Sequence, residues 1–548
     1  MHHAMRRLLP IALVVVLAGC GHSRSSAVER PANAQLPWHT AVVGSDGALL
    51  PWATPDGTGF DRVLRLGWTF LEQQVPIDTR THRRVYLNYA TYNAKTLQGG
   101  YWQDNPASAY AGLVSGVLQW YAYAGDERAV GIVRTMLDYQ LRHGTTPRGW
   151  AWPGVPYATA CAGATAYGGC LAGLPRTFSG GIEPDKIGEL GLAYLKFYEL
   201  TGETRFLRAG VQSADVLARQ IRDTGDARTP WAFRVDARTG RTLDGAQFGG
   251  AVVGPLSLLD EALRLHVGAT APIRAARDRA LHWLIEHQLN PASPDGNRWT
   301  GFYEDVPYNP AGRNQAVPML TAAYLIRGGA AVDPRWSEHA RALVTWVSTH
   351  FAVGPYDGAT GIDEQAFSGG RSCCSNAGLG SDTARFAAVE AQLSARTGAE
   401  AERRTAMSSL AYASYFSLAD GRVSCCGASA YRNPFWFTDG YSDYLQYISQ
   451  ALGALPTLAP PDQDHLLAST SVVQRVRYDR GSVRYRTFDA DSRETLRLAF
   501  RPVRVESDGR RLRQEGTLRA EGYSVRTMGD GDFVVRISHR GHNVGVLG

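Results

Sequence analysis

The 548-residue sequence predicts a mainly α-helical chain, an (α/α)6 toroid of twelve helices arranged as six hairpins, followed by a small antiparallel β domain. Three observations predict this fold. Apolar residues recur with helical spacing in twelve segments. Short glycine turns alternate with long connections between these segments. Beyond residue 458, apolar residues alternate with the period of two that is typical of strands.

The chain begins with the layout of an export signal. Two arginines precede an apolar run from Leu8 to Leu17, which is too short to cross a bilayer. The segment Leu17-Ala18-Gly19-Cys20 resembles the lipobox of bacterial lipoproteins, which implies lipidation at Cys20. We therefore expect a signal peptide over 1–20, a tether and N-terminal extension over 21–50, and an exported protein that a lipid anchors in the periplasm, at the outer membrane or at the cell surface.

The predicted toroid covers residues 51–458. Its helices are expected at 60–74, 107–124, 127–142, 185–201, 204–222, 250–266, 272–288, 314–327, 334–350, 381–397, 400–417 and 439–453. Within a pair the turn is short and carries a glycine, as at Gly125, Gly202 and Gly398, which supplies the left-handed conformation that ends a helix. Between pairs the connection has about 20 to 40 residues, a length typical of functional loops.

Six such hairpins close into a ring with one helix of each pair inside. The predicted inner helices follow the long connections and begin near 107, 185, 250, 314, 381 and 439. Their N-terminal ends, with the partial positive charge of the helix dipole, then face the long loops. An open solenoid is the alternative, but it would need polar capping repeats, and the final helix is strongly apolar.

The β domain is predicted over 459–548. Ala459-Pro460-Pro461 ends the last helix, and strands are expected at 482–486, 495–500 and 532–537. We expect the domain to support the ring by packing, with a sugar-binding module as the alternative.

Composition excludes several classes of protein. A hydrophobic content of 44% excludes disordered and fibrous chains, and a net charge of +6 without basic runs gives no support for nucleic-acid binding. Six cysteines remain besides Cys20, and an oxidising compartment favours disulfides among them. They are Cys161, Cys170, Cys373, Cys374, Cys425 and Cys426. The first two lie in one loop, close enough in sequence to pair.

The long loops concentrate aromatic and acidic side chains. Flat rings bordered by polar groups suit the apolar faces and hydroxyl rims of sugars. The predicted substrate-binding residues are Tyr101, Trp102, Asn105, Trp150, Trp152, Tyr157, Lys186, Tyr308, Arg313, Trp436 and Tyr441. Lys186 and Arg313 are placed where they would hold an acidic sugar, which the helix N-termini also favour.

With this pattern the chain resembles the six-hairpin sugar-active enzymes, which include unsaturated glucuronyl hydrolases and related hydrolases, lyases and uronic-acid epimerases. The resemblance covers about residues 55–455 and rests on the helix count and on phrases such as residues 188–202, GELGLAYLKFYELTG. It implies a carbohydrate substrate. No catalytic signature transfers residue by residue, so the predicted site residues follow from loop position.

Hydrolysis of a glycosidic bond generally uses two carboxyl groups, one as a proton donor and one ionised. The candidates are Asp104, Glu183, Asp185, Glu304 and Asp363. Asp104 and Glu183 also fit helix caps before a proline, and Asp382 and Asp439 fit caps as well. We therefore expect a glycoside hydrolase that acts outside the cytoplasm on a poly- or oligosaccharide containing uronic acid and needs no cofactor.

Three alternatives stay open. A lyase or epimerase would use a tyrosine base, with candidates Tyr101, Tyr157, Tyr303, Tyr308 and Tyr441, and a cation at Lys186 or Arg313. A zinc site would use Glu364, Cys373, Cys374, Cys425 and Cys426, which resemble the ligand inventory of toroidal β-L-arabinofuranosidases, although that family's glutamate-to-cysteine phrase is missing here. The third alternative is a lipoprotein that binds glycans without altering them.

Overall fold

The computed structural model describes residues 36–548 apart from several connecting segments. The residues outside the description are 1–35, 54–56, 88–90, 94–98, 101–105, 160, 162–166, 171–178, 223–228, 244–251, 294–314, 357, 364–377, 425–433, 437 and 519. The expected signal peptide and Cys20 therefore lie outside the described residues. Within the described ranges, no helix combines the length and apolar character needed to cross a membrane.

The twelve predicted helices are all present in the described chain. They are α1 (Gly59–Thr69), α2 (Pro106–Ala124), α3 (Glu127–His143), α4 (Pro184–Thr201), α5 (Thr204–Gln220), α6 (Val253–Arg264), α7 (Thr270–Trp283), α8 (Ala316–Gly328), α9 (Trp336–Phe351), α10 (Gly380–Thr397), α11 (Glu400–Ser414) and α12 (Tyr444–Ala454). Turns of π-helix extend α1 over Phe70–Gln74 and α7 over Leu284–Gln288, and another precedes α12 over Thr438–Asp443.

The helices close into a ring. Helices α2, α4, α6, α8, α10 and α12 form the inner circle, in which each packs against the next and α12 returns to α2. The sixth pair joins α12 to α1, from opposite ends of the toroid sequence. Glycine allows this close approach, because a Cβ atom at Gly67 would lie 2.8 Å from Leu445 Cδ2. Closure excludes the open solenoid.

Short turns join the helices of a pair, as the sequence predicts. Gly202 and Gly398 end α4 and α10 with φ of 73° and 76°, the left-handed conformation that glycine adopts without strain. Asp126 caps α3, since its Oδ1 accepts hydrogen bonds from the backbone N–H groups of Arg128 and Ala129.

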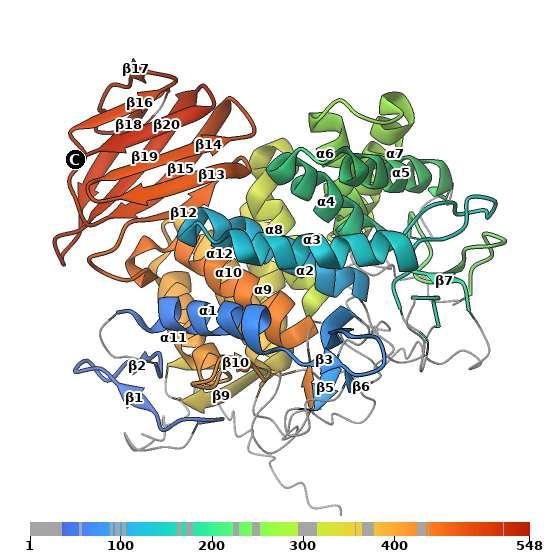
Figure 1. The fold of residues 1–548 in the computed structure, drawn as a ribbon, viewed down its shortest axis with the longest axis horizontal. Helices are drawn as coiled ribbons and strands as arrows, with labels where there is room; N and C mark the ends of the chain where they lie inside the picture. Colours follow the sequence, from blue (N-terminus) through green and yellow to red (C-terminus); the bar gives the residue numbers. More distant parts are fainter. Residues whose placement is uncertain are drawn as a thin grey trace, which may run out of the picture.

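The long connections meet at the other end of the ring through short antiparallel ladders. β7 (Gly181–Ile182), just before α4, pairs with β8 (Val235–Asp236) from the connection after α5. β11 (Pro434–Trp436), ahead of α12, pairs with β5 (Thr91–Asn93), and β5 also pairs with β6 (Gly99–Gly100). Connections far apart in sequence therefore lie side by side where the inner helices begin (Figure 1).

The remaining short strands belong to local hairpins. They are β1 (Val42–Val43) with β2 (Leu49–Leu50), β3 (Ile77–Asp78) with β4 (Arg83–Arg84), and β9 (Ala352–Tyr356) with β10 (Ala359–Ile362). The β1–β2 hairpin packs on α11, where the Tyr415 hydroxyl accepts a hydrogen bond from Val42 N at 2.8 Å. In the N-terminal extension expected over 21–50, residues from 36 onward therefore pack on the ring, apart from those outside the description.

The C-terminal residues form a two-sheet β sandwich, as expected. One sheet has the order β12-β15-β19-β18 and the other β13-β14-β20-β16-β17. The strands are β12 (His465–Ser469), β13 (Val473–Asp479), β14 (Ser482–Thr487), β15 (Asp491–Leu498), β16 (Arg504–Ser507), β17 (Arg510–Arg511), β18 (Gly522–Thr527), β19 (Phe533–Arg540) and β20 (Asn543–Leu547). Both sheets contribute to one apolar core, which includes the fully buried Leu496 and Val546.

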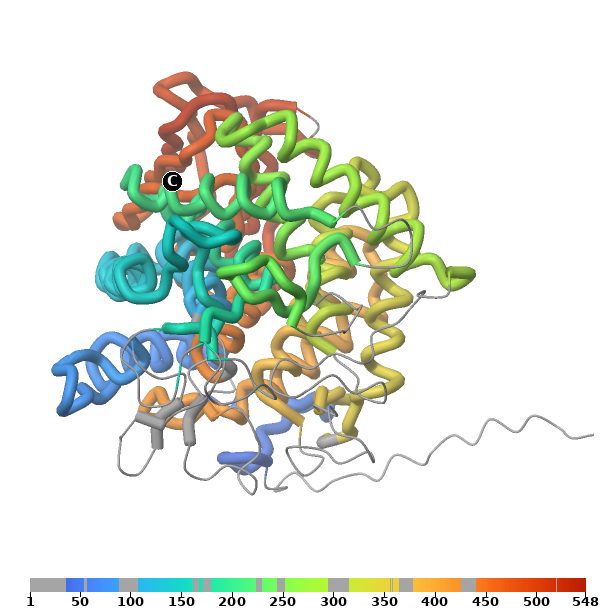
Figure 2. Tube along the Cα trace, turned by 90° about the vertical axis from the view of Figure 1, so that its right-hand side faces the viewer, coloured from blue at the N-terminus to red at the C-terminus, as the bar shows by residue number. Residues whose placement is uncertain are grey.

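The sandwich packs on the short-turn end of the ring. It contacts α2, α4 and α12, and His465 Nδ1 donates to the Tyr123 carbonyl at the end of α2 at 2.9 Å. Gln474 Nε2 donates to the Glu199 carbonyl near the end of α4 at 2.7 Å. The side view agrees, with the red β domain at the top and the blue N-terminal segments below it (Figure 2). The ring thus has a base covered by the sandwich and a mouth formed by the connections.

Candidate active site at the mouth of the ring

The first turns of the inner helices bring polar side chains together at the mouth. The reason is the direction of the helices, since each inner helix begins where the connections meet. The residues are Ser108 on α2, Lys186 and Glu189 on α4, Gln315 at the N-cap of α8, Asp382 and Arg385 on α10, and Gln446 and Tyr447 on α12. Hydrogen bonds and ion pairs divide them into two neighbouring groups.

Arg385 is the centre of the first group. The residue is 5% exposed, and its guanidinium donates to Asp382 Oδ1 at 2.9 Å and to Gln315 Oε1 at 3.1 Å. It also donates to Asp443 Oδ2 at 2.5 Å and lies over the ring of Tyr447, 5.1 Å from its centroid. One buried cation thus joins the beginnings of α8, α10 and α12.

Asp382 has the chemistry of a proton donor. Burial raises the pKa of Asp382 to about 6; the charge of Arg385 opposes this rise, and the charges of Asp443 and Asp363 add to it. Asp363 is fully buried and follows β10, where its N–H donates to the Phe351 carbonyl at 2.9 Å. Asp382 and Asp443 thus pair with the Arg385 guanidinium, and the nearby charges of Asp443 and Asp363 favour retention of a proton on Asp382.

Glu189 is the centre of the second group. The Ser108 hydroxyl donates to Glu189 Oε2 at 2.5 Å, and Lys186 Nζ lies 3.7 Å from Glu189 Oε1 and 3.8 Å from Asp185 Oδ2. Tyr447 adjoins both groups. Burial raises the pKa of Tyr447 to about 12, Arg385 lowers it, and the charges of Asp443 and Glu189 raise it further. The charge of Lys186 is thus already shared between two carboxylates.

Glu183 occupies a third position. It is the N-cap residue of α4, with Pro184 next, as predicted, but its side chain makes no capping hydrogen bond. Arg234 Nε instead donates to Glu183 Oε1 at 2.9 Å, and both side chains are buried. Because Glu183 follows β7 and Arg234 precedes β8, this ion pair holds two connections together. A catalytic role for Glu183 stays a prediction.

The predicted aromatic platforms differ in exposure. Trp150 is half-buried, with Arg238 5.4 Å from its ring centroid. Tyr157 lies edge-on to Trp150, and burial raises its pKa. Trp152 is only 3% exposed, and Tyr441 is fully buried, stacked on Phe70 with its hydroxyl accepting from Val423 N. Trp152 and Tyr441 therefore pack within the core, and the sugar contacts predicted for them stay predictions.

Several predicted residues lie outside the described residues. They are Tyr101, Trp102, Asp104, Asn105, Tyr303, Glu304, Tyr308, Arg313, Glu364, Cys373, Cys374, Cys425 and Cys426. Trp436 contributes its backbone to β11. Cys161 and Cys170 form a disulfide with Cα atoms 5.0 Å apart, which confirms the expected pairing. Within the described ranges, no three His, Cys, Asp or Glu side chains are arranged to hold a metal ion.

Sequence reasoning missed the residues that dominate the mouth. Asp382 was considered only as a cap, and Arg385, Asp443 and Glu189 were not considered. The available signal was the spacing of Asp382 and Arg385, an acid and a base three residues apart at the start of an inner helix.

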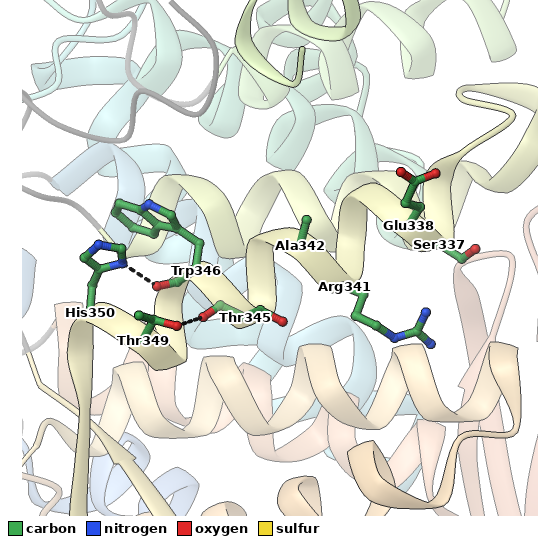
Figure 3. A pocket seen from close by; sticks show the side chains of 8 residues that line it. All are labelled: Ser337, Glu338, Arg341, Ala342, Thr345, Trp346, Thr349 and His350. Atoms are coloured by element: carbon green, nitrogen blue, oxygen red, sulfur yellow. Dashed lines mark hydrogen bonds between the residues drawn. The ribbon is translucent and has the colours of Figure 1, made fainter. Parts of the chain in front are cut away.

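A surface groove of about 600 Å³ lies elsewhere, along the outer helix α9 (Figure 3). Trp346 and His350 line one end, with ring centroids 4.4 Å apart, and Glu338 and Arg341 line the other. Because α9 is an outer helix, this groove is separate from the carboxyl groups of the mouth.

The sequence matches no protein-family model and no curated protein. Solved structures share the fold at low identity. A sugar epimerase from a ruminal bacterium is 10% identical, with a TM-score of 0.50 over 72% of this chain and 97% of that one. A D-mannose isomerase is 10% identical, with a TM-score of 0.51 over 72% and 97%. A family 76 glycoside hydrolase from a bovine Bacteroides thetaiotaomicron strain is 11% identical, with a TM-score of 0.50 over 75% and 83%. These likenesses confirm the predicted (α/α)6 toroid.

Proposed function

We propose that this chain is a carbohydrate-processing enzyme, and specifically a glycoside hydrolase that works by carboxyl acid–base catalysis at the mouth of the ring. The observation that carries the proposal is the buried Asp382 beside Asp443 and Arg385. Its pKa of about 6 leaves a proton available near neutral pH, while Asp443 pairs with Arg385 at 2.5 Å. The three solved structures named above, which share the toroid, are described as an epimerase, an isomerase and a glycoside hydrolase.

In the proposed reaction, Asp382 gives its proton to the glycosidic oxygen as the bond to the anomeric carbon breaks. Asp443 then takes a proton from the attacking water or attacks the anomeric carbon itself, depending on the separation of the two carboxyl groups around the substrate. The Asp443 side chain suits this role because 24% of it is exposed, whereas that of Asp382 is 6% exposed. Gln446 Nε2 donates to Asp443 Oδ1 at 3.2 Å and fixes its orientation.

The enzyme is proposed to act outside the cytoplasm, anchored through Cys20. The Cys161–Cys170 disulfide supports this location, because disulfides persist in oxidising compartments. No cofactor enters the proposed reaction.

A lyase or epimerase is the second candidate, favoured by one specific contact. The guanidinium of Arg385 lies over the ring of Tyr447. A phenol that could act as a base therefore lies next to a cation that could neutralise a sugar carboxylate. The pKa of about 12 keeps Tyr447 protonated at neutral pH, so hydrolysis has the better supported acid and base.

The experiment that tests the proposal incubates the purified protein with neutral and uronic-acid-containing oligosaccharides. New reducing ends are measured together with absorbance near 235 nm, the signature of a new double bond. Reducing ends without that absorbance support the hydrolase, whereas rising absorbance establishes the lyase. If calorimetry shows tight binding of a sugar but no sugar is altered, the protein is a glycan-binding lipoprotein and not an enzyme.

A further inference from the structure

Four arginines form a compact group on the outward face of the five-stranded sheet. In the antiparallel register of β13 and β14, Arg475 lies directly opposite Arg486, and Arg477 lies opposite Arg484. All four are exposed, while Val483 and Tyr485 on the same strand as Arg484 point into the core. We refer to Arg475, Arg477, Arg484 and Arg486 as the arginine face.

The arginine face keeps a net positive charge. Among the described residues, one carboxylate forms ion pairs with it, since Asp479 lies 2.9 Å from Arg477 and 3.9 Å from Arg484. Arg486 donates to the neutral Gln474 side chain at 3.1 Å. Like charges directly opposite one another destabilise a sheet, so the arrangement calls for an anionic partner.

The neighbouring strand leaves the arginine face open. β20 pairs with the other side of β14 and places Asn543 opposite Arg486 and Gly545 opposite Arg484. Asn543 and Gly545 carry no charge, and their small side chains do not cover the neighbouring arginines. With strands about 4.8 Å apart and alternate residues about 7 Å apart along a strand, the four guanidinium groups form a flat positive patch.

Protection of the sheet edge does not explain this patch. Exposed charge on an edge strand such as β13 prevents unwanted strand pairing, but β14 is an interior strand between β13 and β20. Nor does the abundance of arginine in this sequence explain it. On the other sheet, the exposed Arg536 has uncharged residues opposite it, Thr495 on one side and Ser524 on the other. Exposed arginines of this chain are therefore not always placed opposite one another.

We propose that the arginine face is a binding surface for an anionic polysaccharide, whose carboxylate or sulfate groups pair with its guanidinium groups. Planar guanidinium groups bind such oxyanions through two parallel hydrogen bonds. Single-stranded nucleic acid is less well suited, because the outward positions of β13, β14 and β20 named above carry no aromatic ring on which bases could stack. The choice of a polysaccharide as the polyanion rests on the proposed function. The face lies on the sandwich at the base of the ring, so it would hold a polymer apart from the mouth.

The test is native gel electrophoresis of the full-length protein through gels containing polygalacturonate or, as a neutral polymer, mannan. The variant R484T/R486T removes the two arginines of the interior strand with a residue that suits strands. The matched control R526T/R536T makes the same change of charge on the other sheet. We expect polygalacturonate, but not mannan, to retard the wild type, and salt to abolish the effect. R484T/R486T should bind about tenfold more weakly, and the control within about twofold of the wild type.

Equal losses in the two variants would overturn the inference, because net charge alone would then explain the retardation. Tighter binding of the wild type to phosphatidylglycerol vesicles or single-stranded DNA than to polygalacturonate would also overturn it. Circular dichroism and melting curves establish that both variants are folded. Binding is measured without turnover, so failure of the proposed hydrolase would not be mistaken for failure of this surface. If the hydrolase is correct, R484T/R486T should cleave a short oligosaccharide at the wild-type rate.

Discussion

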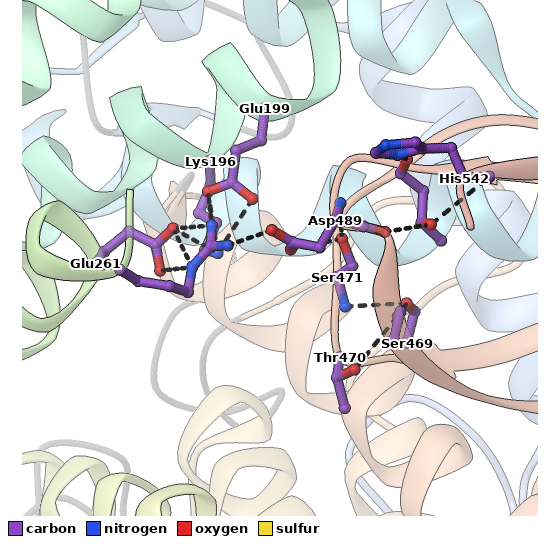
Figure 4. A network of polar contacts seen from close by, with 11 residues as sticks. Lys196, Glu199, Glu261, Ser469, Thr470, Ser471, Asp489 and His542 are labelled. Atoms are coloured by element: carbon purple, nitrogen blue, oxygen red, sulfur yellow. Dashed lines mark hydrogen bonds and ion pairs between the residues drawn. The ribbon is translucent and has the colours of Figure 1, made fainter. Parts of the chain in front are cut away.

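The two ends of the ring each contain a buried group of carboxyl side chains, but they differ in charge balance and in the elements that surround them. At the mouth, Asp382 and Asp443 pair with the guanidinium of Arg385, and Asp363 lies close enough to act on the charge of Asp382. At the base, Glu199 and Glu261 lie with Lys196 and Arg264, and the β sandwich packs over them (Figure 4). Among the described residues, the group at the mouth has three carboxyl groups and one cation, whereas the group at the base, with Asp489 included, has three carboxyl groups and two cations.

The pKa values at the base are also strongly shifted. Burial raises the pKa of Glu199 to about 8. Burial acts in the same direction on Glu261, but hydrogen bonds with Glu199 and Arg264 outweigh it and hold its pKa at about 2. Asp489 from the sandwich pairs with Arg264 at 2.5 Å and covers the group.

The comparison shows that a shifted pKa alone does not identify an active site. Ion pairs that support the fold shift pKa values as strongly as catalytic environments do. What separates the two ends is their surroundings, because the connections lie around the mouth and the sandwich packs on the base. Five predictions follow from this difference, beginning with the largest expected effect.

Asp382→Asn should reduce turnover by about 100-fold or more, because the amide has no proton to give to the leaving oxygen. Initial rates on an oligosaccharide substrate measure the effect, and circular dichroism checks the fold. The matched control is Asp278→Asn on the outer helix α7, which should keep the wild-type rate. Equal activity in the two variants would remove Asp382 from the mechanism.

The rate should also depend on pH with the sign set by Asp382. Its protonated form is the active one, so kcat/KM should fall by about tenfold per pH unit above the pKa of about 6. A pH–rate profile from pH 4 to 9 measures this decline. A rate that stays constant between pH 6 and 8 would contradict the assignment of Asp382 as the proton donor.

Glu261→Gln should destabilise the protein by about 2 kcal/mol, because it leaves Lys196 without an ionised carboxylate and Arg264 with Asp489 alone. This value allows for solvent screening, since 37% of the Arg264 side chain is exposed. Glu199→Gln should cost less than about 1 kcal/mol at pH 7, because the amide resembles the protonated acid already present. Urea denaturation compares the two variants, and the reverse order would contradict the assigned charges.

The same group predicts how stability depends on pH. The pKa of Glu199 is higher in the folded protein, about 8, than its ordinary value of 4.5, so the folded state keeps a proton that the unfolded chain releases. Its contribution to stability is therefore full below pH 4.5 and is lost as the pH rises toward 8. Melting temperatures of the wild type should fall over this range more steeply than those of Glu199→Gln. Parallel curves would show that Glu199 is ionised in the folded state.

Asp489→Asn should have the smallest effect, a loss of about 0.5 kcal/mol. It removes a partly exposed ion pair with Arg264, in which 37% and 29% of the two side chains are exposed. Thermal melting measures the loss. Turnover should not change, because Asp489 lies at the base, and a drop in turnover would show that the two ends are coupled.

The helices were predictable because their signals are local. Apolar spacing gave all twelve, and the glycines at positions 202 and 398 marked the ends of α4 and α10, where both adopt positive φ. Pro184 likewise marked the beginning of α4. Each signal depends on residues within a few positions of one another, so it can be recognised in the sequence without knowledge of the fold.

The site was predictable only in part. Asp363 was a candidate, and the structure places it near Asp382 in the mouth. Trp152 and Tyr441 were expected to bind sugar, but they are buried. Arg385 was missed because its importance depends on Gln315 and Asp443, which are 70 and 58 positions away in sequence. The burial of Arg385 and the charges around it arise only when these distant segments pack together.

Local patterns in the sequence predict the twelve helices, their alternation of short turns and long connections, the change to strands after residue 458, and the proximity of Cys161 and Cys170. The packing of the closed ring, by contrast, sets which carboxyl groups share a cation, which lie under the sandwich, and which aromatic rings have an exposed face. The two kinds of feature differ in how far apart in the sequence the interacting residues lie. Hydrogen bonds within helices and turns involve near neighbours in sequence, whereas desolvation and charge interactions depend on whichever groups the closed ring brings together.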